Sequence, residues 1–247
     1  TTCVNLAASL AATRRRVLLV DMDPQGNATM GSGVDKNALE LSGYDVLTKR
    51  ASPAEVIVKT DASGFDLLPA NGDLTAAEVE LMNEIGREHR LRLALNSVRE
   101  NYDYILIDCP PSLNLLTVNS LSAADSVLIP MQCEYYALEG LGALMNTVEQ
   151  IKETVNPNLE IEGILRTMYD PRNSLTLDVS GQLSEYFGEK VYRAVIPRNV
   201  RLAEAPSYGM PALAYDKTSK GAVAYLALAG EMVRRHGSKK TSAAVAV

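Results

Sequence analysis

The stretch Val17-Leu18-Leu19-Val20-Asp21-Met22-Asp23-Pro24-Gln25-Gly26-Asn27 joins a short apolar run to two aspartates and a turn-forming segment. Four consecutive apolar residues predict a strand that is buried on both faces, as the strands of parallel sheets are. In open parallel sheets, ligands bind beyond the carboxyl ends of the strands. Asp21 and Asp23 are therefore the first candidate site residues.

A second apolar run, Tyr104-Ile105-Leu106-Ile107, ends in Asp108 and continues as Cys109-Pro110-Pro111-Ser112. One strand-terminal aspartate can simply cap the following turn, but two such strand ends together favour a site. A buried strand can fix a carboxylate that holds magnesium through water. Pro110 and Pro111 lock the backbone after Asp108 and remove two N–H donors, which gives a stiff exit from the strand. Cys109 is expected to be a small buried residue without chemistry of its own, because no basic group lies near it in the sequence.

Apolar runs and helical spacing alternate along the chain. The predicted strands cover residues 17–20, 65–69, 104–107, 126–130, 161–168 and 191–196, and the predicted helices cover 88–99, 113–123, 141–155, 175–187 and 221–235. This alternation predicts an α/β fold, with a mostly parallel sheet that carries helices on both faces. Residues 1–236 then form one domain. The tail, 237–247, is small, polar and aperiodic, and is predicted to be disordered.

The amino-acid composition argues against several functional classes. The three cysteines lack CxxC spacing, which favours a reducing compartment and argues against a disulfide frame or a zinc site. Two histidines in 247 residues give poor support to a His-rich metal site or a Ser-His hydrolase. We see no signal peptide and no apolar run of the roughly 18 residues that cross a bilayer. We therefore expect a cytoplasmic protein with no membrane partner.

Charge is uneven along the chain. The formal net charge of −6 argues against general affinity for nucleic acids. The segment 163–201 nevertheless has six basic and four acidic residues, a local surplus of +2. Arg172 and Arg201 lie in this segment. Taken alone, each is most often a solvated surface residue.

Three segments together resemble the ParA/Soj family of partition ATPases, members of the deviant P-loop class that also contains MinD. They are Thr1-Thr2-Cys3-Val4-Asn5-Leu6-Ala7, the 21–27 segment and the 108–112 segment. In that family, a strand and a K-G-G-V-G-K-T loop come directly before the T-T-x-V-N-L-A helix. The resemblance therefore implies that the chain starts just after the P-loop lysine, without the first strand. We expect such a chain by itself neither to hydrolyse ATP nor to bind it tightly. We also expect it to expose the strand edges beside the missing strand and to aggregate.

The resemblance also assigns roles to residues of this sequence. Asp23 positions the attacking water, and Asp21 and Asp108 organise the magnesium shell. Thr1 and Thr2 contact the nucleotide. The switch segments comprise Pro24, Gln25, Gly26, Asn27, Pro110 and Pro111.

Two later segments match the same family. Pro197 and Asn199 are assigned to the base pocket, although a side-chain-capped turn is the alternative for this loop. The segment 132–140 is assigned to subunit assembly.

The resemblance implies a homodimer that binds ATP and Mg²⁺, binds nonspecific double-stranded DNA through Arg172 and Arg201, and is stimulated by a ParB-like protein. The expected location is cytoplasmic and nucleoid-associated. A MinD-like membrane-cycling ATPase is one alternative, but it needs a basic amphipathic anchor where this chain has Thr241-Ser242-Ala243-Ala244-Val245-Ala246-Val247. A nucleotide-independent DNA-binding or regulatory module is the other alternative.

Overall fold

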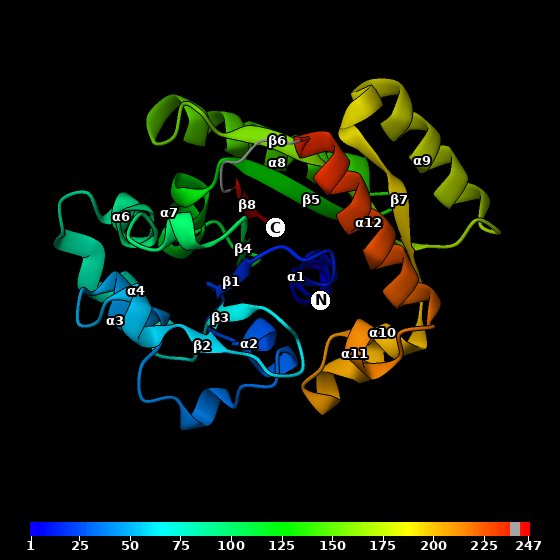
Figure 1. Ribbon diagram of the computed structural model, residues 1–247. Coiled ribbons are helices and arrows are strands. Elements are labelled where there is room, and N and C mark those ends of the chain that lie inside the picture. Colours follow the sequence, from blue (N-terminus) through cyan, green and yellow to red (C-terminus); the bar gives the residue numbers. More distant parts are fainter. Residues whose placement is uncertain (238–242) are drawn as a thin grey trace.

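The computed structural model describes residues 1–237 and 243–247, which form an eight-stranded sheet flanked by helices (Figure 1). The strands are β1 (Val17–Asp21), β2 (Val58–Lys59), β3 (Asp66–Leu68), β4 (Tyr104–Asp108), β5 (Ser126–Gln132), β6 (Glu160–Tyr169), β7 (Val191–Pro197) and β8 (Ala243–Ala246). The helices are α1 (Thr2–Ala12), α2 (Asn27–Gly31), α3 (Gly43–Leu47), α4 (Pro53–Val56), α5 (Leu74–Glu80), α6 (Arg90–Leu95), α7 (Leu115–Ala123), α8 (Ala137–Thr154), α9 (Ser174–Phe187), α10 (Val200–Glu204), α11 (Ala212–Tyr215) and α12 (Lys220–His236).

The strand order is β2-β3-β1-β4-β8-β5-β6-β7. Among the described strands, β2 pairs antiparallel with β3, and all the other pairs are parallel. Parallel neighbours need crossover connections, and helices supply most of them. The predicted α/β fold with a mostly parallel sheet is confirmed.

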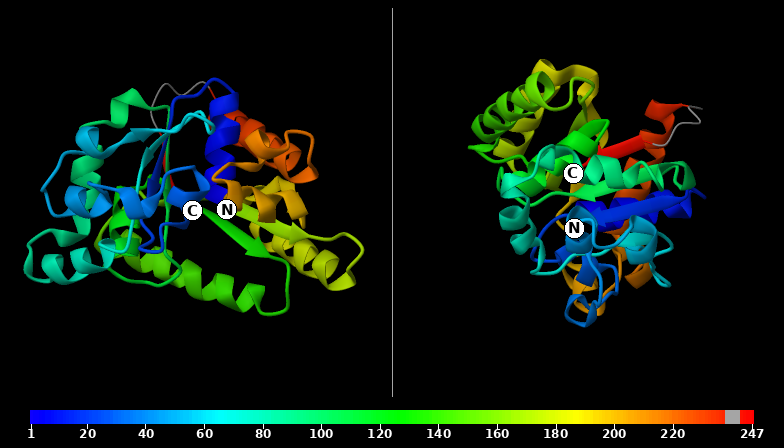
Figure 2. Two further views of the ribbon diagram at one scale, coloured as in Figure 1. Left: turned by 90° about the horizontal axis from the view of Figure 1, so that it is seen from below. Right: turned by 90° about the vertical axis from the view of Figure 1, so that its left-hand side faces the viewer.

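Each face of the sheet has its own hydrophobic core. In β1, Leu18 and Val20 point into the core that includes residues of α3 and α5–α9. Val17 and Leu19 point into the opposite core, which they share with α1 and α12. Figure 2 shows the helices on both sides of the sheet. Because both faces are covered, the strand reads as a continuous apolar run and does not alternate with polar residues.

The predicted helix over 88–99 is shorter in the structure, where α6 begins at Arg90 and ends at Leu95. A 3₁₀ turn, Arg87–His89, precedes α6. The Asn119 side chain of α7 causes the break: its Nδ2 donates to the Arg87 carbonyl at 2.9 Å, and its Oδ1 accepts from the Leu91 N–H at 3.1 Å. In a continuous helix, that carbonyl and that N–H would bond to each other.

The prediction of a disordered tail over 237–247 is wrong for residues 243–246. They form β8, which lies in the middle of the sheet between β4 and β5. Val245 and Ala246 are fully buried, on opposite faces. A strand that is covered on both faces needs only small apolar residues. The absence of an amphipathic pattern in residues 243–246 therefore did not indicate disorder. β8 pairs with both β4 and β5, so these two strands have no open edge where it lies between them. Residues 238–242 lie outside the described part of the chain.

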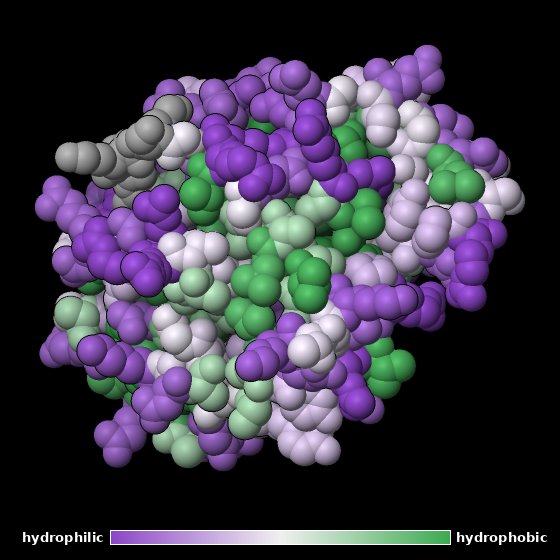
Figure 3. Space-filling view, turned by 45° about the vertical axis from the view of Figure 1, so that its right-hand side comes forward, coloured by the Kyte–Doolittle hydropathy of each residue, from purple (hydrophilic) through white to green (hydrophobic). Residues whose placement is uncertain are grey.

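One face of the molecule carries both apolar and hydrophilic side chains at its surface. Figure 3 shows apolar side chains at the centre of the face it presents, with hydrophilic side chains around them. Independently of that view, the exposed large apolar residues include Leu113, just before α7, and Tyr135 and Tyr136, just before α8, which are 59%, 74% and 73% exposed.

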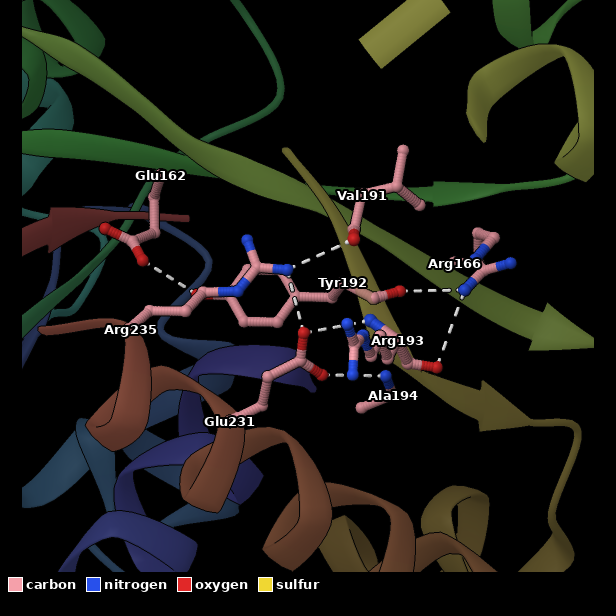
Figure 4. Close-up of polar contacts among 8 residues, drawn as sticks. All are labelled: Glu162, Arg166, Val191, Tyr192, Arg193, Ala194, Glu231 and Arg235. Atoms are coloured by element: carbon pink, nitrogen blue, oxygen red, sulfur yellow. Dashed lines mark hydrogen bonds and ion pairs between the residues drawn. The ribbon is translucent and has the colours of Figure 1, made fainter. Parts of the chain in front are cut away.

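The outermost strand, β7, is held by α12 (Figure 4). The nearly buried Glu231 carboxylate accepts hydrogen bonds from the N–H groups of Arg193 and Ala194, at 3.0 and 2.9 Å. Arg235 pairs with Glu231 at 2.7 Å and stacks on the Tyr192 ring, 3.9 Å from its centroid. Irregular pairing of β6 with β7 accompanies these side-chain bonds. These bonds satisfy backbone groups of β7 that would otherwise be open to another chain.

Candidate functional site

Asp21 and Asp108 end two adjacent strands and face each other in register across the parallel pair β1–β4. The Met22 N–H donates to the Asp108 carbonyl at 3.0 Å, so the two strand exits are joined by their backbones. Asp21 is completely buried, whereas Asp108 is partly exposed. The structure therefore brings together the two carboxylates that the strand pattern singled out.

Both carboxylate oxygens of Asp21 accept hydrogen bonds from the protein. Oδ2 accepts from the N–H and Oγ1 of Thr29, at 2.8 and 2.7 Å, and Oδ1 accepts from the Asp23 N–H at 3.1 Å. Thr29 Oγ1 in turn accepts from the Ala70 N–H at 2.9 Å, just beyond β3. Asp21 thus holds the following loop, α2 and the exit of β3 in one arrangement. Sequence reasoning missed Thr29, because a single threonine in a short polar segment gives no periodic signal.

Burial and negative neighbours act on both of these carboxylates. Burial and the neighbouring Asp108 raise the pKa of Asp21 to about 7. Burial also raises the pKa of Asp108, which the charge of the Thr1 amino group lowers and the charge of Asp23 raises. A bound cation would relieve this repulsion. Within the described residues there is no group of three or more His, Cys, Asp or Glu side chains that could cage a metal. The donor set fits Mg²⁺, which keeps most of its water and takes only one or two protein carboxylates.

The loop after β1 presents Asp23 in a fixed turn. Asp23 Oδ1 accepts from the Gln25 N–H at 2.9 Å, and its carbonyl accepts from the Gly26 N–H at 2.8 Å. Gly26 has a φ of +60°, and a Cβ there would lie 2.7 Å from the Ala70 carbonyl oxygen, so only glycine fits. Asp23 Oδ2 accepts no hydrogen bond from the described residues. The turn therefore offers one free carboxylate oxygen beside the Asp21–Asp108 pair.

Helix α1 approaches the same edge of the sheet. Burial and the charge of Asp108 raise the pKa of the Cys3 thiol, which lies in the first turn of α1. Thr2 Oγ1 lies 3.1 Å from the Tyr225 hydroxyl of α12, and Thr1 directly precedes the helix. The first turn of α1 therefore lies near Asp108.

The loop after β7 folds back toward α1. Asn5 Oδ1 of α1 accepts from the Ala212 N–H at 2.8 Å. Gly33 and Gly209 also meet closely, because a Cβ on Gly33 would lie 2.9 Å from the Gly209 carbonyl oxygen. In the sheet order, β7 lies four strands away from β4, which is about 19 Å at the usual strand spacing. The residues of the loop after β7 come near α1 only because this loop folds back.

The side-chain oxygen of Asn199 has no hydrogen-bond donor among the described residues. It is the N-cap residue of α10, yet its side chain forms no capping hydrogen bond, which does not support the capped-turn alternative. Its Oδ1 is buried without a partner among the described residues. An unsatisfied buried acceptor is costly. The oxygen faces Gly221 of α12, where an added Cβ would lie 3.1 Å from it.

Comparison with known proteins decides the family. Residues 1–161 match the family described as AAA domain. The chain is 54% identical to the sporulation initiation inhibitor protein Soj of Bacillus subtilis, over 94% of this chain and 92% of that protein. It is 50% identical to the chromosome partitioning protein ParA of Caulobacter vibrioides, over 99% and 92% of the two chains.

The chain belongs to the ParA/Soj family of AAA-domain ATPases. A solved structure extends the likeness to the whole fold. It is described as cobyrinic acid a,c-diamide synthase from Mycobacterium smegmatis with a bound ATP analog and magnesium. The TM-score is 0.83 and the identity 37%, with 98% of this chain and 92% of that chain covered.

The arginines that the ParA/Soj resemblance assigns to DNA are exposed but paired. The Arg172 side chain is 88% exposed and contacts its neighbour Asp170 at 2.8 Å. The Arg201 side chain is 48% exposed and contacts Glu204 at 2.7 Å and Asp216 at 3.4 Å. Each positive charge is therefore partly neutralised within the chain.

The remaining predicted residues of this family member can also be placed. Pro110 is buried, Pro111 is exposed, and both follow Asp108 directly. Burial raises the pKa of the Cys109 thiol to about 12, which agrees with a residue that takes no part in chemistry. No helix in the part of the chain that the structure describes is long and apolar enough to cross a membrane.

Proposed function

We propose that this member of the ParA/Soj family is a chromosome- or plasmid-partition ATPase that binds ATP with Mg²⁺ and transfers the terminal phosphoryl group to water. The observation that carries the proposal is the in-register pair Asp21–Asp108, with Asp23 in the rigid turn that follows. Related proteins described with an ATP analog, ADP and magnesium support the choice of ligand.

The three carboxylates have different roles in this proposal. Asp108 is partly exposed and would hold Mg²⁺ through water. Both carboxylate oxygens of Asp21 already accept hydrogen bonds from the protein. Asp21 would therefore support the magnesium shell indirectly, by holding the loop and α2 in place. Asp23 has the free oxygen that can orient the attacking water or accept its proton. The bound cation would neutralise the developing charge on the phosphate oxygens.

The nucleotide would lie between two segments. Thr1 and Thr2 are at the amino end of α1, where N–H groups and the helix dipole favour phosphate. Pro197 and Asn199 would contact the base, as the family resemblance implies, and Asn199 is partly exposed. The Gly33–Gly209 contact joins the segment that follows Asp23 to the base loop.

The wider cycle is also proposed from the family. The switch residues Pro24, Gln25, Gly26, Asn27, Pro110 and Pro111 would respond to the nucleotide. An ATP-bound homodimer would use the exposed Tyr135 and Tyr136 in assembly, since exposed apolar patches mark interfaces. That dimer would bind nonspecific double-stranded DNA through Arg172 and Arg201, and a ParB-like protein would stimulate hydrolysis. This cycle takes place in the cytoplasm, at the nucleoid.

The test is titration of ATP with and without Mg²⁺. The family's K-G-G-V-G-K-T loop does not occur in the 247 residues, so the chain is compared with a version that carries this loop ahead of Thr1. The longer version should bind ATP in a magnesium-dependent way. Asp108→Asn should remove most of the magnesium dependence, whereas the control Asp178→Asn, at an exposed position of α9, should leave it intact. Equal magnesium dependence in the parent and Asp108→Asn would contradict the proposal.

A further inference from the structure

A shallow pocket of about 400 Å³ lies between the turn after α3 and the segment that leads into α6. None of the residues assigned to the nucleotide, magnesium or DNA lines it. Four of its lining residues are basic, and no acidic residue lines it. The residues that matter to the argument are Lys49, Ile85, His89, Arg90, Arg92 and Leu93.

The floor of the pocket carries a buried cation. Arg90 is 8% exposed, and its guanidinium pairs with Glu84 through Nη2 at 2.6 Å. Its Nε and Nη1 have no hydrogen-bond partner among the described residues. Lys49 and Arg92, at the rim, are exposed and form no ion pair within the described chain. Positive charge at this pocket therefore exceeds the negative charge that the protein supplies.

The rim is also apolar. Ile85 is 99% exposed and Leu93 is 61% exposed. Full exposure of an isoleucine leaves apolar surface in water that a partner would cover. Met82, just before this segment, is 58% exposed. Apolar side chains beside unpaired cations match a ligand that has both an apolar group and a negative charge.

The pocket has a fixed base. Asn119 of α7 bonds to the backbone on both sides of the His89–Arg90 corner, at Arg87 and Leu91. His89 Nδ1 lies 2.7 Å from Ser122 Oγ, which ties the same corner to α7 a second time. A preorganised surface loses less entropy when a partner binds.

We propose that this pocket docks a segment of a protein partner in which carboxylates alternate with apolar side chains. Lys49 and Arg92 pair with the carboxylates, the charge of Arg90 favours them from below, and Ile85 and Leu93 cover the apolar side chain. The apolar rim argues against a nucleic-acid backbone, which would leave these two residues without partners. The proposal does not depend on nucleotide binding.

The experiment titrates three synthetic peptides into the ¹⁵N-labelled full chain and follows amide chemical shifts. The probes are acetyl-Leu-Glu-Leu-Glu-Leu-amide and its counterparts with glutamine or lysine at both glutamate positions. The acidic peptide should shift amides of residues 85–96 and Lys49, and should bind at least about tenfold more tightly than the other two. Its affinity should fall as salt rises.

Two sets of variants separate charge from apolar contact. Lys49→Glu with Arg92→Glu should weaken the acidic peptide at least about tenfold, whereas the exposed controls Lys59→Glu with Lys220→Glu should not. Leu93→Ser should weaken it and the control Val223→Ser, at a 53% exposed site, should not. All of these side chains are at the surface, so the variants should fold, and circular dichroism checks this.

Three outcomes would overturn the proposal. The first is no shift at the pocket with the acidic peptide at millimolar concentration. The second is equal binding of the glutamine peptide, which would show an apolar groove without charge preference. The third is a concentration-dependent dimer that Leu93→Ser dissociates in the absence of peptide, which would make a second copy of this chain the occupant.

Discussion

Thr29 donates two hydrogen bonds to a single oxygen of Asp21, from its N–H at 2.8 Å and its hydroxyl at 2.7 Å. The same hydroxyl accepts from the Ala70 N–H, and both Asp21 and Thr29 are completely buried. Thr29→Val keeps the shape but removes the hydroxyl, so two buried polar groups lose a partner. We expect a loss of about 2–4 kcal/mol in the free energy of unfolding, measured with urea. Thr29→Ser should recover most of this loss, and an unchanged stability in Thr29→Val would show that the hydroxyl does not hold the loop.

Glu162 gives a pH-dependent prediction. Although burial raises its pKa, hydrogen bonds from His236, Tyr192 and Ser126 lower it to about 2. Because the folded-state pKa lies below the unfolded value, the stabilisation is full above about pH 4.5 and is lost as the pH falls toward 2. Glu162→Gln should cost about 2–3 kcal/mol at pH 7, and the difference from the parent should shrink steadily in this acidic range. A difference that stays constant from pH 7 to 3 would mean that the charge of Glu162 is not the stabilising feature.

Two glycines of α12 lie in different surroundings, so one serves as the control for the other in a test of packing. A Cβ on Gly221 would lie 2.5 Å from Leu202 Cγ and 3.1 Å from Asn199 Oδ1, whereas on Gly230 it would meet only the flexible Arg234, at 3.4 Å. Gly221→Ala should therefore destabilise the protein by about 1–3 kcal/mol through overpacking. Gly230→Ala should be neutral or stabilising by up to about 1 kcal/mol, because alanine favours the helix. Thermal unfolding measures both, and the reverse order of stability would contradict the packing described here.

The DNA face can be tested with Arg172 and Arg201, because an acidic chain must bind DNA through a local positive surface. In a version that binds ATP, replacing both by Glu should abolish ATP-dependent DNA binding without loss of basal ATPase activity. Single Arg→Ala changes should each lower the salt slope by roughly one ion, and sequence preference should not change. DNA affinity is measured at several salt concentrations with ATP and Mg²⁺. If the double variant kept the parental DNA affinity and salt slope, the DNA-binding surface would lie elsewhere on the protein.

The sequence predicted the parts of the fold that periodic patterns encode. Apolar runs located β1 and β4, and the rule that ligands bind at the carboxyl ends of parallel strands placed Asp21 beside Asp108. Contacts between distant segments left no such pattern. Thr29 binds Asp21 from a short polar helix, and Asn119 interrupts a helix from another element. The β8 residues looked like a tail because small apolar side chains become informative only when their neighbours in space are known.

The central claim is that Asp23 serves the hydrolytic water at a site built on Asp21 and Asp108. It is tested most directly by measuring ATP binding and ATP hydrolysis for Asp23→Ala, with the K-G-G-V-G-K-T loop present ahead of Thr1. Asp23 is expected to act on the water and not on the phosphates. Binding should therefore stay within a few-fold of the parent while hydrolysis slows by on the order of 10² to 10⁴. Hydrolysis at the parental rate would contradict the account.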